Sequence, residues 1–120
     1  MTTPTLVART TQEVFDHHEA AFQSGDMAEL MADYADDAVM LLLDNVAVGK
    51  EAIQELFGSL IGSFPGLNLS FDKTAVEGDL FLLEYSADSD VATIPNGVAT
   101  FIIQDGMIQR QTEWMTVVPK

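Results

Sequence analysis

Apolar residues in the first fifth of the chain recur with the period of an α-helix. From Thr3 to Ser24 they fall on one face every three or four positions, and His18 lies near the centre of that face. Thr3 before Pro4 is typical of a helix start, and Gly25 is typical of a helix end. We therefore predict a helix over residues 3–24, with His18 turned inward and the adjacent His17 on the flank toward water.

The next segments predict two more helices with a strand between them. Asp26 opens the acid-x-x-Glu pattern of a helix start, and the helical spacing continues to Tyr34. Residues 38–44, AVMLLLD, are apolar on both faces and short, which predicts a buried strand. A third apolar stripe predicts a helix from about Lys50 to Ser63, stopped by Pro65-Gly66.

After residue 66 the period changes from helical to alternating. Residues 67–72 alternate strictly, and residues 80–87 are strongly apolar. Residues 98–104 and 107–118 flank Asp105-Gly106, which is a strong signal for a tight β-hairpin. Three helices followed by an antiparallel meander predict an α+β fold.

Length and charge narrow the possible functions. The chain has 120 residues, which suits one domain over 1–120, and its 19 acidic and 5 basic residues give a net charge of −14. Such a charge repels phosphate groups, so neither nucleic acid nor a membrane surface is an expected partner. There is no cysteine, and we see no secretory leader, so we expect a cytoplasmic protein.

The run GDMAELMADYADDAVMLLLDNVAVGKEAIQELFGSL resembles the nuclear-transport-factor-2-like superfamily, in particular its ketosteroid isomerase and SnoaL-type polyketide cyclase branches. The last hairpin, FIIQDGMIQRQTEW, is also similar. The resemblance implies a single SnoaL-like domain with a cystatin-like α+β roll, a conical barrel of curved, mostly antiparallel sheet wrapped around the three N-terminal helices. It also implies an internal apolar cavity and a homodimer formed through the outer face of the sheet.

The resemblance to ketosteroid isomerases can be followed residue by residue. In that branch a first-helix tyrosine and a protonated aspartic acid donate hydrogen bonds to the developing enolate oxygen, while a first-strand aspartate moves the proton. Counting from the shared landmarks puts His18 at the place of the tyrosine, Leu42 at the place of the base and Ala99 near the second acid. Leucine and alanine exchange no proton, so ketosteroid isomerase activity is not expected.

Asp44 is one candidate for the missing base. If Leu42 faces the cavity, strand alternation turns Asp44 the same way, about 7 Å further along at ~3.3 Å per residue. The alternative is that Asp44 and Asn45 form a polar turn after a buried strand.

Glu113 is the other candidate. The family alignment turns Gln111, Glu113 and Met115 inward, where burial would raise the pKa of a carboxyl and suit it to acid–base work near neutral pH. The alternative is an edge glutamate that pairs with Arg110 or Lys73 and has no chemical role.

His18 also has two interpretations. It either lines the cavity as the partner of a carboxylate, or it is a core histidine bonded to a backbone carbonyl or to Tyr34. The predicted catalytic set is therefore His18, Asp44 and Glu113. The side chains expected to contact a ligand are Tyr34, Met40, Leu42, Phe57, Tyr85, Phe101, Gln111 and Met115.

Three functions stay open at this point. The first is a small enzyme of isomerase or cyclase type, acting by acid–base chemistry on a neutral, apolar substrate in a cavity of roughly a few hundred Å³. The second is a non-catalytic binder of a lipophilic ligand, and the third is a dimeric association domain. No cofactor is expected, and no metal, because adjacent helical histidines diverge and make a poor ligand pair.

Overall fold

The computed structural model describes residues 9–120. It confirms the α+β class, with the elements in the order α1, α2, β1, β2, α3 and then β3 to β6. The helices are α1 (Thr11–Ser24), α2 (Met27–Met31) and α3 (Lys50–Ser63). The strands are β1 (Tyr34–Leu42), β2 (Asn45–Val48), β3 (Asn68–Glu77), β4 (Leu80–Asp88), β5 (Ala92–Gln104) and β6 (Met107–Pro119).

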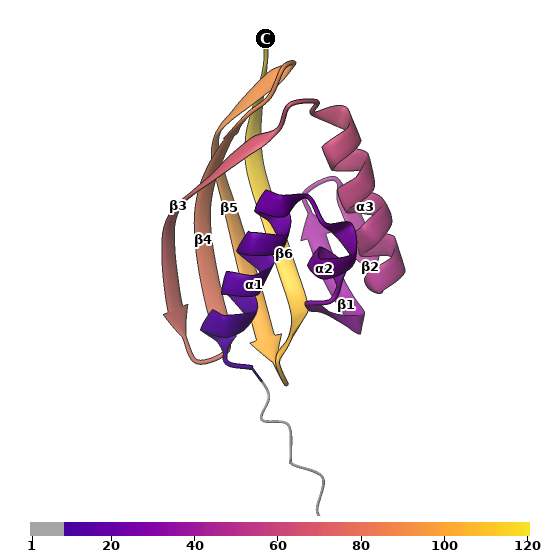
Figure 1. Cartoon of the computed structure of the whole chain (residues 1–120), viewed down its shortest axis with the longest axis vertical. Coiled ribbons are helices and arrows are strands. Elements are labelled where there is room, and N and C mark those ends of the chain that lie inside the picture. The colour runs from indigo at the N-terminus through magenta and orange to yellow at the C-terminus, as the bar shows by residue number, and fades with distance from the viewer. Residues whose placement is uncertain (1–8) are drawn as a thin grey trace, which may run out of the picture.

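The six strands form one curved sheet in the order β2-β1-β6-β5-β4-β3. All neighbouring strands are antiparallel except β1 and β6, which are parallel. The sheet is curved and mostly antiparallel, as predicted, and it is open, because β2 and β3 are its two edges and do not pair with each other. In Figure 1, α1 lies across the inner face of the sheet, and α3 lies beside β1 and β2.

The first helix begins later than predicted. Thr10 and Glu13 form a capping box, in which the Thr10 side chain accepts from the backbone N–H of Glu13 and the Glu13 side chain accepts from that of Thr10. This cap satisfies the backbone N–H groups that would otherwise be left unpaired, and Arg9 and Thr10 are not helical. The predicted start at Thr3 lies outside the described residues.

The second helix is also shorter than predicted, and a strand was missed. Tyr34 opens β1, where it pairs with Ile108 of β6, and does not continue α2. Leu43 and Asp44 form the turn after β1, as the turn interpretation of Asp44 predicted, but Asn45 already belongs to the strand β2 (Asn45–Val48), which forms a hairpin with β1. In both places the pairing of strands decides the structure, and local spacing does not reveal that pairing.

Among the other bounds, β1 ends at Leu42 and not at Asp44, β3 continues to Glu77, and β5 begins at Ala92, six residues before the predicted start. The signals at the ends of helices and in the last turn are confirmed. Asp26 caps α2 through its side chain, α3 spans residues 50–63 as predicted, and Asp105-Gly106 makes the last hairpin with φ of 54° and 71°. No helix within residues 9–120 is long and apolar enough to cross a membrane.

The core lies between α1 and the inner face of the sheet. Phe15 stacks on Phe81 of β4 with ring centroids 4.0 Å apart and meets the ring of Phe101 of β5 edge-on at 5.8 Å. All three side chains are at most 2% exposed. This packing fixes the distance between α1 and the sheet, and it therefore positions His18, one turn further along α1.

Candidate functional site

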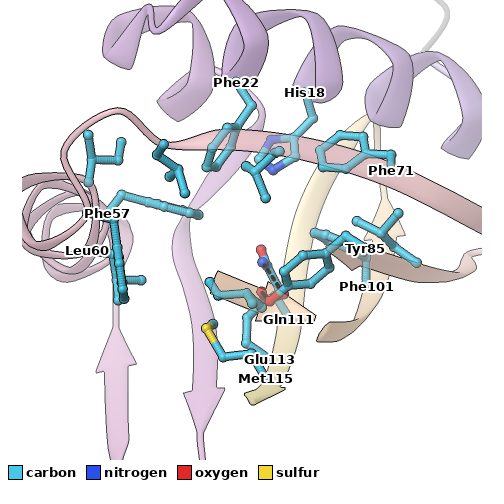
Figure 2. A pocket seen from close by; sticks show the side chains of 16 residues that line it. His18, Phe22, Phe57, Leu60, Phe71, Tyr85, Phe101, Gln111, Glu113 and Met115 are labelled. Carbon is cyan, nitrogen blue, oxygen red and sulfur yellow. Dashed lines mark hydrogen bonds between the residues drawn. The ribbon is translucent and has the colours of Figure 1, made fainter. Parts of the chain in front are cut away.

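A pocket opens between α1, α3 and the inner face of the sheet. Its walls are mostly phenylalanine and leucine side chains, and its polar side chains are His18, Tyr85, Gln111 and Glu113. The volume is about 80 Å³, which is smaller than the few hundred Å³ expected. Figure 2 shows His18 and Phe22 projecting from α1 toward Gln111 and Glu113 on the opposite side. We call this the inner pocket.

Glu113 reaches the inner pocket because alternation along β6 turns it to the inner face. Its Oε1 accepts a hydrogen bond of 2.9 Å from the Tyr85 hydroxyl, and its Oε2 accepts one of 3.1 Å from Nε2 of Gln111. Burial among apolar side chains raises the pKa of Glu113 to about 7, although the two hydrogen bonds favour the carboxylate and lower it in part. Both protonation states are thus populated near neutral pH.

A second hydrogen bond holds Gln111 in place. The hydroxyl of Tyr34 donates to Oε1 of Gln111 at 2.5 Å, and both side chains are buried. Because the amide oxygen is occupied by Tyr34, the amide nitrogen is directed at Glu113. Burial, together with the charge of Glu113, raises the pKa of Tyr34 well above its usual value, so Tyr34 stays a donor at all ordinary pH values.

A glycine makes room for Tyr85. Gly97 of β5 lies directly opposite Tyr85 of β4, and a Cβ at Gly97 would lie within 2.8 Å of three atoms of the tyrosine ring. The ring therefore covers the glycine backbone, in a position from which its hydroxyl reaches Glu113. Burial raises the pKa of Tyr85 above its ordinary value as well, so this hydroxyl is also a permanent donor.

His18 lies on the other side of the inner pocket. Its side chain is 4% exposed, and its ring meets those of Tyr34 and Phe101 edge-on. Within residues 9–120, Nδ1 of His18 is buried without a hydrogen-bond partner, but it lies 3.5 Å from Oδ2 of Asp33. The prediction that His18 faces inward is confirmed, and its ring packs against Tyr34 without a hydrogen bond to the Tyr34 hydroxyl, which donates to Gln111.

Asp33 is a fully buried carboxylate that sequence reasoning missed. It accepts hydrogen bonds from Nδ1 of His17, at 2.7 and 2.9 Å to its two oxygens, and from Nη1 of Arg9 at 2.9 Å. Burial alone would raise the pKa of Asp33, but the nearby ring nitrogens of His18 and His17 and the guanidinium of Arg9 outweigh burial and lower it. Asp33 is therefore ionised, and it connects His18 in the pocket with His17 at the surface.

His17 is bound at both ring nitrogens. Besides Asp33 at Nδ1, Glu29 lies 2.8 Å from Nε2. These two carboxylates raise the pKa of His17. The sequence predicted a surface position on the flank of α1, which agrees with the 36% exposure of the side chain, but it did not predict the two partners.

The register of the sheet relates Glu113 to the ketosteroid isomerase pattern. Ala99 of β5, near the expected place of the second acid, is the direct cross-strand partner of Glu113 on β6. Cross-strand partners project to the same side of a sheet, with Cβ atoms about 5 Å apart. A carboxyl thus lies on the neighbouring strand, directly opposite position 99.

Comparison with known families decides the classification. Residues 14–111 match the SnoaL-like domain family over most of the chain. The protein belongs to this family. No curated protein matches the sequence.

Several solved structures have the same fold. A Sinorhizobium meliloti protein, provisionally assigned as a polyketide cyclase, shares 19% identity and a TM-score of 0.77, covering 84% of this chain and 93% of its own. A Mesorhizobium loti NTF2-like protein of unknown function shares 24% identity and a TM-score of 0.77, and the match covers 88% of this chain and 90% of that protein. TerC, co-crystallised with polyporic acid, shares 15% identity and a TM-score of 0.78, and the match covers 88% of this chain and 91% of TerC.

The remaining predicted residues of this SnoaL-like protein occupy three environments. Those that line the inner pocket are Phe57, Tyr85, Phe101, Gln111 and Met115. Leu42 and Asp44 line a second, neighbouring pocket together with Glu113, and Asp44 is exposed there. Tyr34 and Met40 are buried in the core and line neither pocket. Residues 9–120 contain no cluster of three or more histidine, aspartate or glutamate side chains suited to a metal ion.

Proposed function

We propose that this SnoaL-like protein binds a neutral, largely apolar small molecule in the inner pocket and moves a proton on it by acid–base chemistry, without a cofactor, as isomerases and cyclases do. The observation that carries the proposal is Glu113, a carboxyl with a pKa of about 7 on one side of an apolar pocket that has His18 on the other side. A general acid or base works best when its pKa lies near the working pH.

Each part of the site supports one aspect of proton transfer. The apolar walls stabilise the protonated form of Glu113, and the donors of Tyr85 and Gln111 stabilise its carboxylate. Glu113 can therefore take a proton from the substrate or give one back at modest cost. A carboxylate behind Nδ1 of His18, supplied by Asp33, favours a proton on that nitrogen and leaves Nε2 as an acceptor for the substrate.

Proton exchange on a simple ketone would test the proposal. We would incubate cyclopentanone, a single-ring ketone small enough for the inner pocket, in D₂O and follow loss of its α-proton signals by NMR. The wild type should exchange these protons faster than buffer, with a rate that changes around pH 7. Glu113→Gln should lower the enzymatic rate by roughly 100-fold or more, the usual contribution of a general acid or base. Glu84→Gln is the matched control, because Glu84 is exposed on β4 and lines neither pocket.

A non-catalytic ligand binder is the second candidate. It is favoured by the fact that both oxygens of Glu113 already have partners within the protein, as a static anchor would. The co-crystal of TerC with polyporic acid supports small-molecule binding by this fold in general. Saturable binding of cyclopentanone with no exchange above buffer would favour this candidate over an enzyme.

We also propose that the protein is a cytoplasmic homodimer associated through the outer face of the sheet. That face exposes Leu41, Leu80, Leu82 and Trp114, each 44–45% accessible, and an apolar face of this kind is typical of an interface. Light scattering at micromolar concentration should give twice the 13.1 kDa mass of the chain. A monomer would refute the dimer, and cell fractionation would test the location.

A further inference from the structure

A second pocket borders the inner pocket. This outer pocket is lined by Leu42, Leu43, Asp44, Trp114 and Val117, and by four residues that it shares with the inner pocket, namely Leu60, Phe64, Glu113 and Met115. The two pockets therefore adjoin along these four side chains. Glu113 therefore contacts both spaces, and any molecule bound in the outer pocket lies next to the candidate acid.

The two volumes differ strongly. The inner pocket has about 80 Å³ and the outer one about 390 Å³. A water molecule needs about 10–15 Å³ on this measure, so the inner pocket admits a group of about six heavy atoms. The outer pocket alone falls within the range of roughly 300–1,000 Å³ that is usual for ligand sites. A substrate larger than one ring must place most of its atoms in the outer pocket.

The chemistry of the lining restricts the substrate further. The walls of the outer pocket are apolar except for the carboxyl groups of Asp44 and Glu113, and no lysine or arginine lines either pocket within residues 9–120. An anionic ligand would thus meet carboxylates without a compensating arginine or lysine, in a chain whose net charge is −14. Asp44, exposed at this pocket, can accept a hydrogen bond or pair with a cation.

We propose that the substrate is an elongated neutral or cationic molecule. It places a single ring or similar compact apolar group in the inner pocket and a larger apolar body in the outer pocket. A hydroxyl or ammonium group on this body donates a hydrogen bond to Asp44. This rests on the proposed function of the inner pocket. In this arrangement Glu113 lies at the junction of the two parts, so the proton moves at the bond that joins the ring to the body.

Methyl NMR on the intact 120-residue chain can follow the two pockets separately. Ile94 lines only the inner pocket, Val117 only the outer one, and Met115 both. Benzyl alcohol, a one-ring probe, should shift the Ile94 and Met115 signals and leave Val117 unchanged. 4-(Aminomethyl)biphenyl should shift all three, and biphenyl-4-carboxylate should bind at least tenfold more weakly.

Asp44→Asn tests the donor site, with Asp37→Asn as its matched control, because Asp37 is an exposed acid on β1 that lines neither pocket. Asp44→Asn should weaken 4-(aminomethyl)biphenyl about two- to fivefold, as expected for an exposed ion pair, and leave benzyl alcohol unchanged. Equal binding to Asp44→Asn and Asp37→Asn would overturn the role of Asp44.

The outcomes separate this inference from the proposed function. If benzyl alcohol binds at Ile94 but no biphenyl shifts Val117, the two-part substrate is wrong while the inner pocket keeps its role. If neither probe shifts Ile94, the proposed function fails with it. If the carboxylate binds as well as the amine, the expected charge of the substrate is wrong.

Discussion

Replacing Glu113 by glutamine should change how the stability of the protein depends on pH. The raised pKa means that the folded protein holds a proton on Glu113 more tightly than the unfolded chain does. Below about pH 4.5 Glu113 is protonated in both the folded and the unfolded protein, so its ionisation does not lower the stability of the fold. As the pH rises from 4.5 through about 7, the folded protein must bury a charge that the unfolded chain leaves in water. Stability is therefore lost as the pH rises.

The size of this loss follows from the pKa. A pKa raised from 4.5 to about 7 lowers the free energy of unfolding by about 3 kcal/mol above pH 7, because each pKa unit represents about 1.4 kcal/mol. A chain of 120 residues unfolds with an entropy of about 0.25 kcal/mol/K near its melting temperature. The loss should therefore lower the melting temperature by about 12 °C. Glutamine cannot ionise, so Glu113→Gln should not show this loss.

Thermal unfolding followed by circular dichroism between pH 4 and pH 8.5 would measure this effect. Any constant cost of the amide itself cancels, because the quantity of interest is the change with pH of the difference between variant and wild type. Glu84→Gln, at an exposed position on β4, should unfold in parallel with the wild type. If Glu113→Gln and wild type also stay parallel over this range, Glu113 is not buried in an apolar pocket, and the reasoning on the site is wrong.

Four further changes probe the network around the pocket. Gly97→Ala should lower the free energy of unfolding, measured in urea, by about 1–3 kcal/mol, because its methyl group displaces the ring of Tyr85. Tyr85→Phe should leave the fold intact and raise the pKa of Glu113, which carboxyl ¹³C NMR would measure. His17→Asn should destabilise the protein most below pH 6.5. The difference in stability between variant and wild type should shrink as the pH rises through the raised pKa of His17. If this difference does not depend on pH, His17 does not bond to its two carboxylates as described. Asp33→Asn should lower the free energy of unfolding by about 2 kcal/mol, with no change in the slope of that free energy against denaturant concentration. An unchanged free energy of unfolding would mean that the charged hydrogen bonds of Asp33 make no net contribution to stability.

The parts of the fold that the sequence predicted well are those set by local chemistry. A capping aspartate started α2, a proline-glycine pair ended α3, and Asp105-Gly106 made the last hairpin. The errors arose where strand pairing decides. Tyr34 has helical spacing to α2, yet it pairs with β6, more than 70 residues away, and that partner is not visible in a local pattern. β2 is a short strand that forms a local hairpin with β1, and its four residues alone give only a weak strand signal.

The same division applies to the site. Alternation along the last strand predicted that Gln111 and Glu113 share a face, which the structure confirms. The hydrogen bonds that tune Glu113 could not be predicted, because Tyr34 and Tyr85 come from strands whose register the sequence leaves open. The one local signal for Tyr85 was Gly97, since a glycine within a strand often marks close approach of another group.

Asp33 shows why adjacent histidines were hard to interpret from the sequence alone. Neighbouring helical positions diverge by about 100°, which argues against a common ligand for His17 and His18. A single buried carboxylate that follows α2 nevertheless meets both, because it lies in the angle between them, 2.7 Å from Nδ1 of His17 and 3.5 Å from that of His18. The divergence that makes the pair unsuitable for a metal is what allows Asp33 to join a pocket histidine to a surface one. Any protonation of His17 therefore changes the charge next to His18, which ties the electrostatics of the pocket to a side chain in contact with water.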